Sequence, residues 1–188
     1  GEAARLIRSG GYDVMVAGGC EATLDPVGLI GFVLLKAVAE RYSDPKTASR
    51  PFDRRRNGFV MSEGAGVVIL EELGHALARN AEPLAELLGY GASADAYRIT
   101  DSHPRGEGAV LAMRSALEDA GISPSQIDYI NAHGTSTIKN DAVESAAVKE
   151  VFGKTAASIP ISSNKSLLGP PIADSGAIEV VLTILGMK

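Results

Sequence analysis

Short apolar runs alternate with segments of helical spacing along this chain, and that alternation limits the folds open to it. Residues 12–18 form a nearly continuous apolar run, which predicts a buried parallel strand. Helical spacing follows over residues 26–40, with a proline near its start, and strands are predicted again over 58–61 and 64–70. Because strands separated by helices favour parallel pairing, the pattern indicates an α/β fold with much of its sheet parallel.

The same alternation continues to the end of the sequence. A helix predicted over residues 1–8 stops at Gly10 and Gly11. Residues 83–97 alternate weakly and predict either one long strand or two shorter ones broken at Gly89 and Gly91. Further helices are predicted over residues 71–81, 106–120, 141–152 and 176–185, and further strands over 127–133 and 159–163.

Composition excludes several classes of protein. The 188 residues are 45% hydrophobic and carry a net charge of −5, which rules out a disordered chain and argues against a nucleic-acid binder. Cys20 is the single cysteine, so no internal disulfide can form. No apolar stretch reaches the roughly 18 residues that a membrane-spanning helix needs, so we expect no membrane segment.

Two polar segments follow predicted strands, at the place where α/β sheets bind their ligands. His133 ends the first of these strands, and an imidazole there can donate its N–H to a developing oxyanion or move a proton. The alternative is a histidine that is hydrogen-bonded within a tight loop. Lys165 follows the second strand and can hold an anion or pair with a carboxylate; its alternative is a solvated surface lysine.

The remaining titratable residues carry weaker signals. Asp141 and Glu144 stand three apart at a predicted helix start, where their simplest role is to complement the helix dipole. Cys20 has no base motif beside it and is predicted to pack in the core. His75 is predicted to be solvated and His103 to lie in a turn, and because the three histidines lack metal-ligand spacing we expect no metal site.

Both ends of the sequence fall inside predicted secondary structure. Residue 1 opens within a helical pattern, without an initiator methionine, and the last residues stop in the middle of an apolar run. We therefore expect the chain to be a piece of a longer protein.

Taken together, the segments resemble the β-ketoacyl-acyl-carrier-protein synthases, the condensing enzymes of fatty-acid synthesis, and particularly the elongating type. The likeness runs nearly end to end. It is carried by GEAARLIRSGGYDVMVAGGCEA at 1–22, SRPFDRRRNGFVMSEGAGVVILEE at 49–72, LGYGASADAYRIT at 88–100, DYINAHGTST at 128–137 and SSNKSLLG at 162–169.

The resemblance implies a thiolase-like fold with layers in the order α-β-α-β-α, present here in part. Residues 1–82 would end the N-terminal half, and 83–188 would begin the C-terminal half. The parent protein would be an acyltransferase that elongates acyl chains by decarboxylative Claisen condensation of an acyl-enzyme with malonyl-acyl-carrier protein. Its partners would be acyl- and malonyl-acyl-carrier proteins, without nucleic acid or membrane, in a homodimer that needs no cofactor. Its compartment would be the bacterial cytoplasm, a plastid or a mitochondrion.

The resemblance also assigns roles to residues. His133 matches the family's first catalytic histidine, which binds the malonyl thioester oxygen and helps decarboxylation. Lys165 matches the active-site lysine, Glu144 the acidic residue that neighbours it, and Asp141 a nearby acidic position. Thr135 and Thr137 are implied to bind substrate.

The departures from the family pattern bear directly on activity. The nucleophilic cysteine would lie upstream of Gly1, and Cys20 is no substitute for it. The family's second histidine position holds Pro170, within a run over 170–175 that departs from the pattern. Asn57 and Ser62 replace a usual Asp and Gly. We therefore predict that this chain alone is inactive, and two alternatives stay open: a non-catalytic partner subunit, or a degraded remnant.

Overall fold

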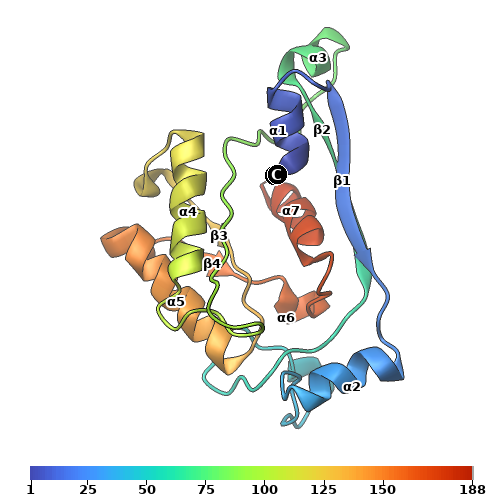
Figure 1. The fold of residues 1–188 in the computed structure, drawn as a ribbon, viewed down its shortest axis with the longest axis vertical. Helices are drawn as coiled ribbons and strands as arrows, with labels where there is room; N and C mark the ends of the chain where they lie inside the picture. The colour runs from blue at the N-terminus through green and yellow to red at the C-terminus, as the bar shows by residue number, and fades with distance from the viewer. Residues whose placement is uncertain (188) are drawn as a thin grey trace. The chain divides into compact units, whose positions relative to one another are not determined.

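The structure is a computed structural model that describes residues 1–187, and its chain separates into two compact units (Figure 1). Unit 1 contains residues 1–22, 63–88 and those from Pro171 onward, whereas unit 2 contains residues 23–62 and 89–170. Each unit is therefore assembled from stretches that lie far apart in the sequence.

A two-stranded antiparallel sheet is the centre of unit 1. Strand β1 (Val14–Glu21) pairs with β2 (Gly64–Glu71), so that Gly19 lies opposite Gly66. Along β1 every second residue is exposed, beginning with Val14. The prediction of a buried parallel strand was therefore wrong. The reason is that β1 has an antiparallel neighbour and only one half-covered face, whereas its apolar composition is typical of strands covered on both faces.

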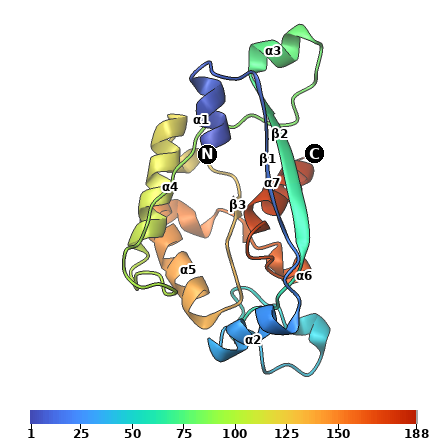
Figure 2. The same ribbon diagram turned by 45° about the vertical axis from the view of Figure 1, so that its right-hand side comes forward.

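Helix α7 (Ser175–Gly186) contacts both strands (Figures 1 and 2). A side chain at Gly66 would place its Cβ 2.6 Å from the main-chain nitrogen of Ile178, so glycine is required for this close approach. Cys20 points to the other face of β1 and is exposed. Our prediction that it packs in the core was wrong, because the period of two along the strand turns it outward.

Two shorter helices complete unit 1: α1 (Glu2–Arg8) and α3 (Leu73–Ala78). Just before α3, the carboxylate of Glu71 accepts hydrogen bonds from the Arg79 guanidinium, at 2.6 and 2.7 Å, and contacts Nδ1 of His75 at 2.6 Å. These bonds, that of Arg79 first, lower the pKa of Glu71 to about 2. His75 is thus partly exposed but held by a carboxylate.

Unit 2 contains the longer helices. Asp25 caps α2 (Pro26–Leu34), because its Oδ1 accepts from the main-chain N–H groups of Val27 and Gly28 at 2.8 and 2.9 Å. The helix ends earlier than predicted, since Val38 leaves it to form a parallel bridge with Phe59. In the predicted strand over residues 58–61, strand pairing is limited to this bridge.

Helices α4 (Glu107–Ala120) and α5 (Ile138–Phe152) contact each other, as Figures 1 and 2 both show. Val148, Phe152 and Ile159 form the buried apolar cluster of unit 2. Strands β3 (Ile130–Asn131) and β4 (Ile161–Ser162) pair in parallel. The shorter helical elements are the 3₁₀ turns η1 (Pro45–Thr47), η2 (Pro124–Gln126) and η3 (Gly153–Ala157), and α6 (Lys165–Leu168).

Residues 83–97 contain no strand, contrary to both forms of our prediction. Within this segment Gly89 and Gly91 lie against α4 so closely that a Cβ on either would overlap the helix backbone at Ala116 or Ala112. The weak alternation therefore comes from an extended segment that packs on a helix, not from one that pairs in a sheet.

Candidate functional site

The turn that follows β3 and the segment that follows β4 meet in unit 2. The hydroxyl of Ser163 donates to the carbonyl oxygen of Gly134 at 2.8 Å. Because parallel strands end at the same edge of a sheet, the residues just beyond them lie together. The structure thus brings the segments of His133 and Lys165 to one place, as the two predicted strand ends require.

The carboxylate of Glu144 fixes the backbone of this turn. Its Oε1 accepts from the main-chain N–H of His133 at 2.7 Å, and its Oε2 accepts from that of Gly134 at 2.8 Å. The Nδ2 of Asn140 donates to the same Oε2 at 3.3 Å. Hydrogen bonds to a carboxylate are among the stronger ones in proteins, so α5 holds the turn in a defined position while His133 itself stays exposed.

Asp141, 1% exposed, ties a second segment to the start of α5. Its Oδ2 accepts from the main-chain N–H of Phe52 at 2.7 Å and lies 3.5 Å from Nε of Arg56. The same guanidinium donates to the carbonyl oxygens of Thr137 and Ile138 at 3.0 and 2.9 Å. Asp141 and Arg56 therefore act as a structural pair that joins the loop over residues 50–57 to the helix.

Helix α5 begins three residues earlier than predicted. Thr137, not an acidic residue, is its N-cap, and its Oγ1 accepts from the main-chain N–H of Asn140 at 3.3 Å. The hydroxyl of Thr135 lies 2.9 Å from that of Thr137. Both threonine side chains are thus oriented by the turn and helix start that carry His133.

Lys165 is 2% exposed, so the alternative of a solvated surface lysine was wrong. It is the first residue of α6, and its main-chain N–H donates to the hydroxyl of Ser163 at 3.3 Å. Its carbonyl oxygen accepts from the hydroxyl of Ser49 at 2.5 Å. Lysine side chains are rarely so buried unless they are paired, so Lys165 is a candidate functional residue beside the His133 turn.

The backbone around the turn adopts unusual conformations. Gly134 has φ of +38°, and a Cβ there would lie 2.5 Å from that of Ser163. Ser136 and Phe52 have φ of 67° and 62°, values that L residues rarely adopt. The buried hydroxyl of Ser136 accepts from the main-chain N–H of Arg50 at 3.0 Å. Such residues cluster at functional sites, where surrounding contacts hold them in place.

Sequence reasoning missed Phe52, Ser136 and Arg56 as parts of this site. Arg56 belongs to the run of three arginines over 54–56, and that run gave no sign of which member turns inward. Phe52 and Ser136 both have a positive φ, and nothing in their residue types predicts that conformation.

The segment that departs from the family pattern is buried at several positions. Pro170 is buried and has no side-chain donor or acceptor. In unit 1, Asp174 is 1% exposed, and neither of its carboxylate oxygens has a hydrogen-bond partner among the described residues.

Across residues 1–187, no three His, Cys, Asp or Glu side chains gather in a way that could hold a metal ion. Within the same residues, no helix is long and apolar enough to cross a membrane.

Solved structures define the class of protein. One chain of a solved complex, described as a type II PKS acyl-carrier protein with its ketosynthase bound to the hexaketide, matches 98% of this chain at 43% identity. The TM-score is 0.96, and the match covers 46% of that chain. A beta-ketoacyl synthase from Burkholderia phymatum matches 99% at 40% identity, with a TM-score of 0.92 over 44% of its length. The fold is thus part of the α/β fold of the thiolase-like ketosynthases.

Family models identify the chain more closely. The beta-ketoacyl synthase N-terminal domain matches residues 1–76, and the beta-ketoacyl synthase C-terminal domain matches residues 84–188. The chain belongs to the beta-ketoacyl synthase family, whose members are condensing acyltransferases.

Curated relatives agree with this family. The 3-oxoacyl-[acyl-carrier-protein] synthase 2 of Coxiella burnetii is 45% identical over the whole chain, and the mitochondrial enzyme of Arabidopsis thaliana is 47% identical. The chain spans 45% and 41% of the lengths of these two relatives.

Proposed function

We propose that this chain is part of a 3-oxoacyl-acyl-carrier-protein synthase that elongates acyl chains in fatty-acid synthesis. One observation carries the proposal: Glu144 holds the His133 turn beyond β3, beside the segment of buried Lys165 beyond β4. The family match over both stretches of the chain supports the same reaction.

The reaction needs a hydrogen-bond donor beside the oxygen of a thioester. The bond between the α-carbon and the carboxyl group of the malonyl thioester breaks, CO₂ leaves, and the electron pair passes into an enolate. His133 donates an N–H to the thioester oxygen, where the negative charge gathers. The α-carbon then attacks the acyl thioester carbonyl on the enzyme, and the enzyme's thiolate is expelled.

The other residues position this group. Glu144 fixes the backbone on which His133 stands, and Asp141 holds the neighbouring loop through Phe52 and Arg56. Lys165 lies buried near the site, and the hydroxyls of Thr135 and Thr137, which lie 2.9 Å apart, would bind substrate.

The parent protein would divide into thiolase-like halves after residue 82, and acyl- and malonyl-acyl-carrier proteins would be its substrates. A solved relative has been captured with its acyl-carrier protein, which supports that partner. The parent would act as a homodimer without a cofactor. Relatives named mitochondrial and chloroplastic support an organelle as its compartment, and bacterial relatives support the bacterial cytoplasm as the alternative.

A partner subunit without catalysis is the second candidate. Pro170 favours it, because a proline cannot donate the hydrogen bond that a second histidine would give to the oxyanion. Solved relatives include ketosynthases with a chain length factor, at 37% and 35% identity.

An acyl-transfer assay tests the prediction that the chain alone is inactive. The purified chain is incubated with radiolabelled acyl-acyl-carrier protein, and covalent label is measured after denaturation. We expect no label, since Cys20 lies exposed on β1 without a base motif beside it. A Cys20→Ser variant is the control, and a stable thioester lost in that variant would contradict our prediction that the chain alone is inactive.

Activity in the longer protein separates the two candidates. His133→Asn there should abolish malonyl decarboxylation, whereas His75→Asn, in unit 1, should leave it unchanged. Decarboxylation that survives His133→Asn would overturn the role given to His133, and its absence in the unmodified protein would overturn the enzyme proposal and favour the partner subunit.

A further inference from the structure

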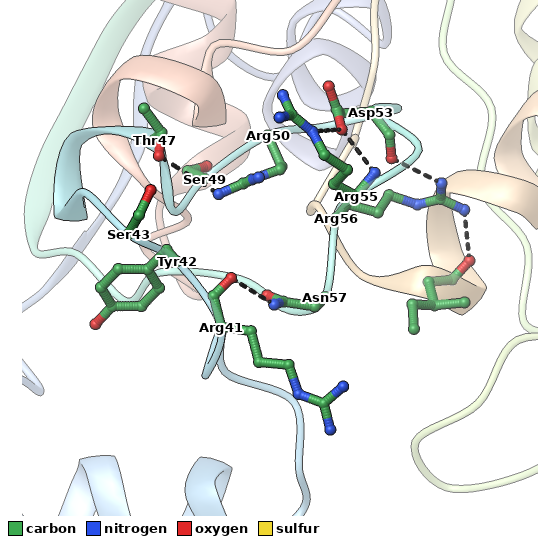
Figure 3. A pocket seen from close by; sticks show the side chains of 11 residues that line it. Arg41, Tyr42, Ser43, Thr47, Ser49, Arg50, Asp53, Arg55, Arg56 and Asn57 are labelled. Atoms are coloured by element: carbon green, nitrogen blue, oxygen red, sulfur yellow. Dashed lines mark hydrogen bonds and ion pairs between the residues drawn. The ribbon is translucent and has the colours of Figure 1, made fainter.

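A cavity of about 820 Å³ in unit 2 is lined mainly by polar and basic side chains (Figure 3). Its size falls within the range of small-molecule sites, about 300–1,000 Å³. The lining residues are Arg41, Tyr42, Ser43, Thr47, Ser49, Arg50, Asp53, Arg55, Arg56, Asn57 and Ile138. Four guanidinium groups thus face one carboxylate, in a chain whose net charge is −5.

Two of the four arginines have carboxylate partners. Arg56 is bound to Asp141 and to two carbonyl oxygens of the α5 start, so it is part of the fold. Arg55 pairs with Asp53, whose Oδ1 accepts from the Arg55 main-chain N–H at 2.6 Å and lies 3.4 Å from the guanidinium Nε. That main-chain bond, ahead of the weaker effects of the Arg55 and Arg50 guanidinium groups, lowers the pKa of Asp53.

Arg50 and Arg41 are not neutralised in this way. Among the described residues, neither has a carboxylate within ion-pair distance. The Nε of Arg50 is buried without a hydrogen-bond partner, and its Nη2 reaches only the Thr47 hydroxyl, at 3.4 Å. Buried N–H donors are nearly always bonded in proteins, so this unused one lacks a partner that the described residues supply.

The position of these groups defines what they can bind. In Figure 3, Arg50, Arg55 and Arg56 gather on one side of the cavity, while Arg41 and Tyr42 stand apart from them. A planar carboxylate is satisfied by one guanidinium fork, whereas a tetrahedral phosphoryl group uses donors from several directions. The cavity is also large enough for an organic group beside Tyr42 and Ile138.

We propose that this cavity, here called the arginine pocket, binds the phosphoryl group of a small organic phosphate, with Arg50 as the principal cationic contact on the side of the cavity where Arg55 also lies. The proposal does not rest on the condensation reaction. The ligand would carry a dianionic tetrahedral group, and its organic part would contact the ring of Tyr42.

Calorimetric titration of the chain with phenyl phosphate, inorganic phosphate and benzoate, all at one ionic strength, tests the ligand class. We expect phenyl phosphate to bind at least tenfold more tightly than benzoate, and inorganic phosphate to bind between the two. Equal binding of phenyl phosphate and benzoate, or no binding of phenyl phosphate, would overturn the proposal.

Variants test the residues. Arg50→Gln should weaken phenyl phosphate binding about tenfold, and Arg50→Lys should weaken it less, because it keeps the charge but loses the fork. Arg54→Gln is the matched control, since Arg54 is exposed in the same loop but does not line the pocket. An equal loss in Arg54→Gln would show only general attraction of anions and would contradict the site.

Arginine modification gives a second readout that does not depend on any variant folding. Phenyl phosphate should protect Arg50 from phenylglyoxal, as peptide mass spectrometry would show, and leave Arg54 reactive. Protection of both arginines alike, or of neither, would count against the arginine pocket.

Discussion

At Gly134 the backbone leaves no room for a side chain. The Cβ of any other residue would lie 2.5 Å from that of Ser163 and 2.9 Å from the ring of Phe52, at a φ of +38° that L residues avoid. Gly153 has a similar φ of +54°, but nothing lies within 4 Å of where its Cβ would be. The two glycines therefore separate the effect of backbone strain from that of crowding.

Gly134→Ala should lower the free energy of unfolding by about 3 kcal/mol or more, because strain and overlap add. Gly153→Ala should cost about 1 kcal/mol, from strain alone. Urea unfolding followed by circular dichroism measures both. Equal losses in the two variants would mean that Ser163 and Phe52 move aside freely and that the turn is not held as described.

The candidate site was partly predictable from the sequence. The NAHGTST and SSNKS segments made His133 and Lys165 candidates, because polar residues followed predicted strands, and the family resemblance alone assigned them roles. Burial of Lys165 was not readable, since it depends on packing between stretches that are distant in the sequence, such as the Ser49 hydroxyl on its carbonyl. The same holds for Glu144, whose spacing indicated only a helix start.

Two aspartates precede helices in the same way but differ in their contacts. Asp25 accepts two main-chain N–H groups at the start of α2. Asp174 precedes α7, yet makes no side-chain capping bond and is almost fully buried. An unpaired buried carboxylate costs free energy, whereas a capping one stabilises its helix.

The same substitution should therefore have opposite effects at these two positions. Asp174→Ala should raise the free energy of unfolding by about 1–3 kcal/mol, because it removes an unsatisfied buried group. Asp25→Ala should lower it by about 1 kcal/mol, through loss of the cap. Thermal and urea unfolding of both variants would check this, and a destabilised Asp174→Ala would reveal a role for that carboxylate beyond the contacts described.

At the scale of elements, helices were predicted better than strands. Helix α4 ends before Gly121, which takes the left-handed conformation that its position after the helix indicated. Strands β3 and β4 are only two residues long, although the sequence pattern predicted longer strands over residues 127–133 and 159–163. Strand length depends on which neighbours pair with it, and no local pattern records that.

The whole molecule exposes an apolar surface on one face of the sheet in unit 1. Val16 and Ile69 lie directly opposite each other, and both are 69% exposed. Val14 and Val67 extend the same face at 42% and 58% exposure. Contiguous apolar surface of this kind promotes association, so we expect the chain to form oligomers or aggregates unless a partner covers it.

Val16→Thr combined with Ile69→Thr should raise the monomer fraction in size-exclusion chromatography with light scattering, at little cost in stability. Met15→Thr with Leu70→Thr is the matched control, because this neighbouring pair lies on the half-buried face. That control should lose about 2–4 kcal/mol of unfolding free energy and gain no solubility. Unchanged association in the outward variant would contradict the role given to this face.

The make-up of unit 1 has a consequence for synthesis on the ribosome. Its sheet combines β1 with β2, and α7, which contacts both strands, comes from the stretch after Pro171. The ribosome must therefore synthesise nearly the whole described sequence before α7 emerges. Helix α7 covers the inner face of this sheet. Until then both faces of β1 and β2 stay accessible to chaperones, and contacts so distant in sequence form slowly.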